Sequence, residues 1–102
     1  MGEFVPVAKA ADLGIGEMAA YAVSGKRIAV ANVGGRYYAF DDTCPHRACS
    51  LTEGELEGDV VTCGCHFSEF NVQTGSVLSG PATVPVATYA VRTEGPELQV
   101  EA

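Results

Sequence analysis

The groups best suited to chemistry in this chain are its four cysteines and two histidines, which all lie between positions 44 and 66. They form two short clusters, Cys44-Pro45-His46 and Cys63-Gly64-Cys65-His66, with Cys49 between them. Thiolates and imidazoles together are a ligand set for transition metals. The grouping therefore predicts one metal centre that is held by two loops.

The spacing of these groups distinguishes between kinds of metal centre. Each cluster supplies one cysteine and one histidine, in the order C-x-H, sixteen residues, then C-x2-H. A structural zinc site usually places two cysteines together and two histidines together, which this chain does not do. A mononuclear zinc site and a small disulfide-stapled domain with two incidental histidines stay open as alternatives.

The ligand pattern resembles the signature of Rieske proteins, in which two cysteines hold one iron of a 2Fe-2S cluster and two histidines hold the other. The resemblance assigns Cys44 and Cys63 to the inner iron, and His46 and His66 to the outer iron. Neutral imidazoles remove negative charge from the cluster, so its reduction potential is expected between about −150 and +300 mV. One such cluster per chain is the expected cofactor.

The resemblance extends over about the whole chain. Residues 50–62 are similar to the segment between the ligand loops of Rieske ferredoxins, and residues 70–75 are similar to the segment after the second loop. Residues 80–86 resemble the third loop of these domains, in which Pro81 would cover the cluster. The resemblance implies an all-β Rieske fold for a single domain, residues 1–102, with a barrel or sandwich base and an inserted cluster-binding subdomain at about residues 42–81.

Short apolar runs separated by glycine-containing turns also indicate an all-β chain. Tight turns are expected at Ser24-Gly25 and Gly34-Gly35, and a helical turn is expected only within residues 8–13. The predicted strands are 4–7, 19–23, 27–32, 36–40, 55–56, 60–62, 69–72, 89–92 and 98–100.

Cys49 and Cys65 stand outside the ligand set that the resemblance implies. They occupy the positions of the disulfide that joins the two ligand loops in high-potential Rieske proteins, whereas most soluble ferredoxins of the family have apolar or small residues there. The resemblance thus suggests the hypothesis that Cys49 and Cys65 form this disulfide. A reducing cytoplasm, where structural disulfides are scarce, opposes it.

Residues next to the ligands are expected to tune the reduction potential, because hydrogen bonds to cluster sulfurs favour the reduced state. Ser68 matches a hydroxyl donor of high-potential family members, but it could instead bond only to the backbone. Phe70 stands where those members have tyrosine, and its side chain cannot donate a hydrogen bond to a cluster sulfur. We therefore expect a potential in the lower part of the Rieske range. Ala48 and Phe67 replace the family's usual glycines and Gly64 replaces a proline, which leaves the loop conformation open.

Composition limits the classes of partner. Six basic and thirteen acidic residues give a formal net charge of −7, which argues against nucleic-acid binding and favours docking on basic protein surfaces. No apolar run approaches the roughly 18 residues that cross a membrane, and the N-terminal residues lack the features of a signal peptide. We expect a cytoplasmic monomer with no membrane partner.

Among Rieske proteins, the chain most resembles the ferredoxin component of multicomponent aromatic-ring dioxygenases. The resemblance implies an electron carrier rather than an enzyme, which takes electrons from an NAD(P)H-dependent flavin ferredoxin reductase and passes them singly to a terminal oxygenase. Both histidines are assigned to the cluster, so none is left for a mononuclear-iron site that could react with oxygen. No G-x-G-x-x-G motif for a dinucleotide follows a strand. Two alternatives stay open: a Rieske-like small subunit of a larger enzyme such as nitrite reductase, and a soluble high-potential carrier of the respiratory type.

Overall fold

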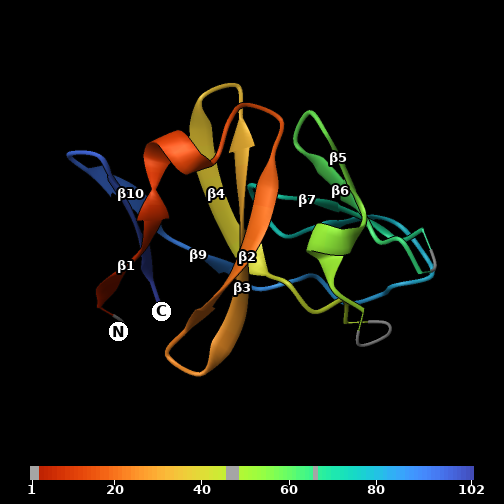
Figure 1. The fold of residues 1–102 in the computed structure, drawn as a ribbon. Coiled ribbons are helices and arrows are strands. Elements are labelled where there is room, and N and C mark those ends of the chain that lie inside the picture. Colours follow the sequence, from red (N-terminus) through yellow and green to blue (C-terminus); the bar gives the residue numbers. More distant parts are fainter. Residues whose placement is uncertain (1–2, 46–48, 66) are drawn as a thin grey trace.

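The computed structural model describes residues 3–45, 49–65 and 67–102. These residues form three antiparallel sheets and two turns of 3-10 helix, η1 (Ala10–Asp12) and η2 (Leu51–Glu53). Two sheets make up the base of the molecule, which also carries both chain ends, and the third sheet lies in a separate lobe on the right of Figure 1. The expected all-β fold is confirmed, and the part of the chain described contains no helix long and apolar enough to cross a membrane.

The strands are distributed over the sheets in a fixed order. The first base sheet has the order β1-β11-β10, the second has β2-β3-β4-β9, and the third has β5-β6-β7-β8. The third sheet, with the loops that flank it, is called the outer lobe (residues 42–81) below. The strand bounds are β1 Phe4–Lys9, β2 Met18–Val23, β3 Lys26–Val33, β4 Arg36–Asp41, β5 Glu55–Glu57, β6 Val60–Thr62, β7 Glu69–Asn71, β8 Val77–Ser79, β9 Thr88–Tyr89, β10 Val91–Glu94 and β11 Glu97–Glu101.

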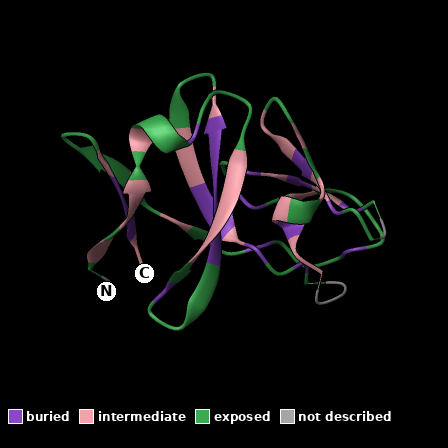
Figure 2. Cartoon of the chain, in the orientation of Figure 1, coloured by how far each residue is buried: buried purple, intermediate pink, exposed green. Residues whose placement is uncertain are grey.

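Strand β3 lies between the two hydrophobic cores of the molecule, and it is the mostly purple central strand of Figure 2. Ile28 and Val30 belong to the base core, together with residues of β11. Ala29 and Ala31 belong to the second core, which is otherwise built mainly from the outer lobe. Successive side chains of a strand point to opposite faces, so the outer lobe packs on the face of β3 that turns away from the base core.

Local turn chemistry explains the hairpins of the base. Gly34 and Gly35 both have positive φ angles, 61° and 97°, as the tight turn between β3 and β4 requires. The side-chain oxygen of Asn32 accepts a hydrogen bond from the Gly35 N–H at 2.9 Å and braces the same turn. Both predicted turns and the helical turn within residues 8–13 are confirmed. The prediction that no other helical turn occurs was wrong, because η2 forms at Leu51–Glu53.

Two strand predictions were incomplete. Strand β8 was not expected, and the run predicted as one strand at residues 89–92 is divided between β9 and β10. Strand β9 pairs with β4 in the second sheet, whereas β10 pairs with β11 in the first. A chain that crosses from one sheet to another keeps its alternating pattern, so sequence periodicity does not reveal the break. The described sheets are open, and the base is a sandwich rather than a closed barrel.

Tyr89 connects β9 to the end of β4. Its hydroxyl donates a hydrogen bond to a carboxylate oxygen of Asp41 at 2.7 Å. Burial of the ring, then the hydrogen bond to Asp41 and the negative charge of Asp41, raise the pKa of Tyr89 to about 12. The protonated phenol therefore stabilises the pairing of β9 with β4 in the second base sheet.

We expect this contribution to be lost in alkali. A group whose pKa is raised on folding stabilises the protein fully below its unfolded pKa, here about 10, and loses that effect as the pH rises through about 12. The difference in urea midpoint between the native protein and Tyr89→Phe should therefore shrink from pH 9 to pH 12. Tyr37→Phe is the control, because the Tyr37 hydroxyl bonds the neutral carbonyl of Ala10. A difference for Tyr89→Phe that is the same at both pH values would contradict the prediction.

Candidate metal centre

The two cysteines assigned as ligands, Cys44 and Cys63, lie in the core between the outer lobe and β3. Cys44 comes shortly after β4 and is 2 % exposed, and Cys63 comes directly after β6 and is fully buried. Neither cysteine is in a disulfide. His46 and His66 lie outside the described residues, so their role as ligands stays a prediction.

Backbone hydrogen bonds close the first loop at its base. Thr43 and Ser50 form an isolated antiparallel bridge. The Cys44 N–H donates to the carbonyl of Cys49 at 2.9 Å. The two ends of this loop are therefore held side by side, with Cys44 at the point of closure.

The second loop is a tight turn between β6 and β7. The Cys63 N–H donates to the Ser68 carbonyl at 2.8 Å, and the Phe67 N–H donates to the Cys63 carbonyl at 2.9 Å. Phe67 has a φ of 62°, in the left-handed region that residues other than glycine rarely adopt. This conformation gives a physical reason for glycine as the usual residue at this position of the pattern.

A disulfide joins the two loops. It links Cys49 to Cys65, whose Cα atoms are 6.5 Å apart, so the pair that the resemblance suggested is present in the structure. Cys65 is exposed and Cys49 is half-buried. The bridge lies at an open pocket that is also lined by Ser50, Glu53 and Gly64.

We expect the bridge to stabilise the fold without being needed for iron binding. The double variant Cys49→Ala/Cys65→Ala should lose about 3 kcal/mol of unfolding free energy, because the bridge closes a loop with a sequence separation of 16. Its iron content per chain should equal that of the native protein, because Cys44 and Cys63 are unchanged. Urea denaturation and iron analysis measure the two effects. Two results together would show that the bridge is absent in solution. The double variant would have the urea midpoint of the native protein, and the unreduced native protein would have four alkylated cysteines after iron removal.

Ser68 connects the second loop to the third. It is fully buried, and its Oγ accepts a hydrogen bond from the Ala82 N–H at 3.0 Å. The backbone partner considered as the alternative is therefore observed. This bond uses a lone pair of the oxygen and leaves the hydroxyl hydrogen for a second acceptor, so donation to a cluster sulfur stays a prediction. Phe70 is fully buried in the same core, whereas Pro81, beside Ala82, is exposed.

Asp42 is a buried charge that the sequence did not single out. Its carboxylate accepts hydrogen bonds from Arg27 Nε at 2.7 Å, from the Thr52 N–H at 2.9 Å and from the Ser50 hydroxyl. Burial raises the pKa of Asp42, but the bonds from Ser50, Thr52 and Arg27 outweigh burial and hold the pKa below its usual value. The carboxylate is therefore ionised at neutral pH. The only sequence signal was an acidic residue two positions before Cys44.

Comparison with known proteins identifies the family of this fold and loop arrangement. Residues 3–90 match the family described as the Rieske [2Fe-2S] domain. The chain belongs to this family. The Rieske chain is 41 % identical over 95 residues to the ferredoxin component of biphenyl 2,3-dioxygenase from Rhodococcus jostii (strain RHA1), covering 93 % of this chain and 89 % of that protein. It is 45 % identical over 73 residues to ferredoxin CarAc of Metapseudomonas resinovorans, covering 72 % of this chain and 68 % of that protein.

Solved structures of Rieske ferredoxins have the same fold. A chain in the complex of reduced oxygenase and oxidised ferredoxin of carbazole 1,9a-dioxygenase superposes with a TM-score of 0.91 and 38 % identity, over 96 % of this chain and 92 % of that one. The ferredoxin of Sphingomonas yanoikuyae B1 superposes with a TM-score of 0.92 and 27 % identity, over 98 % and 99 % of the two chains.

The Rieske residues of this chain fit a 2Fe-2S cluster. Of the four cysteines, two are paired in a disulfide and two are unpaired in the core, and each pair has one member from each loop. Buried thiols from two loops that a disulfide holds together suit one buried iron, and the sequence places a histidine two or three residues beyond each of them. The division of the cysteines into a bridge and a ligand pair is the observation that favours the cluster over a zinc site or a purely disulfide scaffold.

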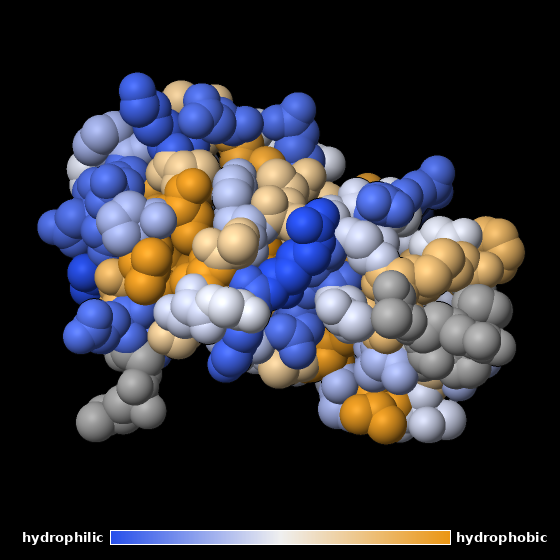
Figure 3. Space-filling view, turned by 60° about the horizontal axis from the view of Figure 1, so that its bottom comes forward, coloured by the Kyte–Doolittle hydropathy of each residue, from blue (hydrophilic) through white to orange (hydrophobic). Residues whose placement is uncertain are grey.

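Exposed apolar side chains gather on the outer lobe. Phe67, Leu78 and Val84 are 72 %, 51 % and 56 % exposed and lie in or next to this lobe. The fourth large exposed apolar residue of the described part of the chain, Ile15, lies in the base. Figure 3 shows apolar surface on the right-hand lobe, which the hydrophilic centre of this view separates from the apolar surface of the base. Such surface near a metal centre is available for contact with another protein.

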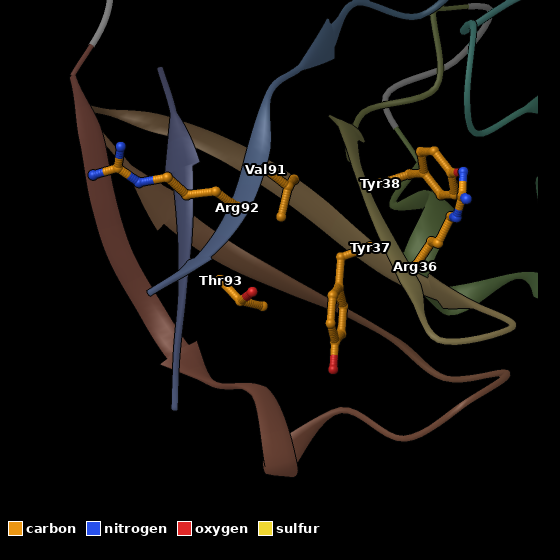
Figure 4. Close-up of a pocket in the computed structure, with 6 residues that line it drawn as sticks. All are labelled: Arg36, Tyr37, Tyr38, Val91, Arg92 and Thr93. Atoms are coloured by element: carbon orange, nitrogen blue, oxygen red, sulfur yellow. The ribbon is translucent and has the colours of Figure 1, made fainter. Parts of the chain in front are cut away.

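A groove in the base lies apart from the cysteines. It runs between β4 and β10 and is lined by residues 36–38 and 91–93 (Figure 4). In the close-up the side chains of Arg36 and Arg92 extend to opposite sides and do not converge on the groove. Arg92 instead lies over the ring of Phe4 at 4.1 Å and donates to Gln99. The groove therefore gathers no set of groups that could perform chemistry.

Proposed function

We propose that this Rieske chain carries electrons within an aromatic-ring dioxygenase system. It takes them from an NAD(P)H-dependent flavin reductase and passes them one at a time to the terminal oxygenase. The observation that carries the proposal is the pair of buried, unpaired cysteines on two bridged loops, in a chain that resembles ferredoxin components along almost its full length. The chain is a component of electron transfer and not itself an enzyme.

Four side chains would hold the cluster: Cys44 and Cys63, which lie in the core, and His46 and His66, which follow them in the sequence. When bound, the cluster supplies one-electron transfer in the Rieske range of potential. Leu51 and Phe70 are fully buried in the core that contains both cysteines, and Ala82 is 3 % exposed there. These apolar side chains exclude water from the cysteine side of the site, so exchange with a partner must occur from the side of the loop tips.

The outer lobe is proposed as the docking face for both partners. Phe67 lies next to His66 in the chain and is 72 % exposed, and Val84 follows Pro81 in the third loop. A few well-packed residues near the centre of an interface, aromatic ones among them, supply most of its affinity. The net charge of −7 favours partners with basic docking surfaces and raises the rate of encounter. We further propose that the chain acts as a monomer in the cytoplasm, because a shuttle has to leave each partner.

A redox titration followed by electron paramagnetic resonance tests this function. The reduced protein should give a rhombic 2Fe-2S signal with a lowered average g value, and its midpoint should lie near or below about −50 mV. Purified reductase and oxygenase should then turn over only when the chain is added. A midpoint above about +150 mV would favour the high-potential respiratory-type carrier, which the observed Cys49–Cys65 disulfide makes the second candidate.

Phe67 offers a test of the docking face. Phe67→Gly should raise the unfolding free energy by about 1 kcal/mol, because glycine adopts a φ of 62° without strain. It should also raise the apparent KM of the oxygenase for the chain severalfold and leave the midpoint potential unchanged. Phe67→Ala is the matched control, since it removes the ring but retains the strained backbone. Oxygenase kinetics that are unchanged in both variants would remove Phe67 from the docking face.

A further inference from the structure

Asp42 lies where the base, the start of the first loop and the end of that loop meet. It directly follows β4 and is fully buried, and it is the only buried carboxylate among residues 3–45, 49–65 and 67–102. A buried carboxylate is expensive to retain unless its hydrogen bonds are satisfied, and no described buried side chain lacks a partner. The bonds of Asp42 therefore indicate what the charge does.

These bonds hold the first loop to the base. The Asp42 N–H donates to the carbonyl of Arg27 at 3.1 Å, and Arg27 Nε returns a bond to the carboxylate at 2.7 Å. On the other side, the Leu51 N–H donates to the Asp42 carbonyl at 2.6 Å, and the Thr52 N–H donates to the carboxylate at 2.9 Å. One residue thus fixes the loop that contains Cys44 against β3.

The charge of Asp42 is only partly neutralised at the loop. The Arg27 side chain is 61 % exposed, whereas the Asp42 side chain is fully buried. Water screens the exposed guanidinium much more than the buried carboxylate. Asp42 precedes Cys44 by two residues, so their Cα atoms are at most about 7.6 Å apart. The loop is therefore exposed to a net negative field.

We propose that Asp42 is a positioning residue that anchors the first loop and, through its negative charge, lowers the reduction potential of the metal centre, with Arg27 as a partial counter-charge. The proposal rests on the assignment of Cys44 as a ligand in the proposed function. It gives a reason to expect a low potential that does not depend on the missing hydroxyl at Phe70. A carboxylate next to the site disfavours the added electron, because reduction increases the negative charge there.

Two charge-changing variants with opposite expected signs test the proposal. Asp42→Asn keeps the size of the side chain and one carbonyl oxygen but removes the charge. At a fixed ambient potential its ratio of reduced to oxidised protein should rise about tenfold, a midpoint shift of about 59 mV for one electron. Arg27→Gln removes the exposed counter-charge and should move the midpoint in the opposite direction by a smaller amount. Lys26→Gln, which removes the neighbouring charge that lies over the Tyr89 ring instead, is the matched control.

Hydrogen exchange gives a second readout that does not depend on electron transfer. In Asp42→Asn the segment 49–53 should exchange at least about tenfold faster, because the Thr52 N–H loses its charged acceptor. A merely structural Asp42 would give faster exchange with an unchanged midpoint, and that result would overturn the electrostatic part of the proposal. If Asp42→Asn does not bind the cluster, an unchanged or raised midpoint potential in Arg27→Gln would overturn the electrostatic part of the proposal. Absence of a 2Fe-2S signal in the native protein would instead overturn the proposed function, and exchange would still test the anchor.

Discussion

Replacing Cys63 with serine is expected to leave the protein without its cluster. Cys63 is fully buried, directly after β6, and its N–H is already bound to the Ser68 carbonyl. A serine hydroxyl is a harder donor that retains its proton, so it does not replace a thiolate toward iron. Removing a residue that only supports a ligand reduces metal affinity by about 10- to 100-fold. Removing the ligand itself should therefore reduce metal affinity by more than about 100-fold. Iron analysis and the reduced-state resonance signal should both show this loss.

The disulfide cysteines provide a control for this experiment within the same loops. The double variant Cys49→Ser/Cys65→Ser has the same kind of substitution at two positions in the same loops and should retain iron. Cys44→Ser should behave like Cys63→Ser, since both thiols are buried and unpaired. If Cys63→Ser retained the signal and the double variant lost it, Cys49 and Cys65 would be the ligands in place of Cys44 and Cys63.

Much of the base could be predicted because its signals are local. Ser24-Gly25 and Gly34-Gly35 require positive φ angles at adjacent positions, and the flanking alternation indicates strands whatever the rest of the chain does. The division between β9 and β10 is different, because it depends on which neighbouring strand offers a free edge. Nothing near residue 90 in the sequence records that choice.

The site shows the same division between local and distant information. The ligand spacing is a short motif, and the Cys49–Cys65 pair could be inferred by resemblance. The partners of Asp42 and Ser68 are 8 to 15 residues away, and the bond from Arg27 comes from a strand of the base. Hydrogen bonds between distant segments leave no periodic or motif signal, so the anchor of the first loop became visible only in the fold.

Gly54→Ala is expected to destabilise the outer lobe strongly, although it adds only one methyl group. A Cβ at Gly54 would lie 1.9 Å from the carbonyl oxygen of Thr62 and 3.0 Å from the Gly64 N. Both atoms are backbone, and Thr62 is paired with Glu55 between β6 and β5, so neither atom can move without separating the strands. Overpacking typically costs 1–3 kcal/mol and sometimes more. We expect a loss of about 3 kcal/mol, which in a domain of this size lowers Tm by more than about 10 °C.

The effect of Gly54→Ala should extend to the metal centre, because Gly54 allows the end of the first loop to lie against the start of the second. Gly64→Ala is the matched control on the opposite loop. Its Cβ would lie 3.5 Å from the Glu53 carbonyl oxygen, which is an ordinary contact, so Tm and iron content should change little. Calorimetry and iron analysis on both variants distinguish two explanations for a loss of stability. One is the close approach of the two loop backbones at Gly54, and the other is that neither loop accepts an added side chain. Equal Tm values for the two variants would mean that the loops do not lie this close in solution, and the proposed cage of two bridged loops would then need a different packing.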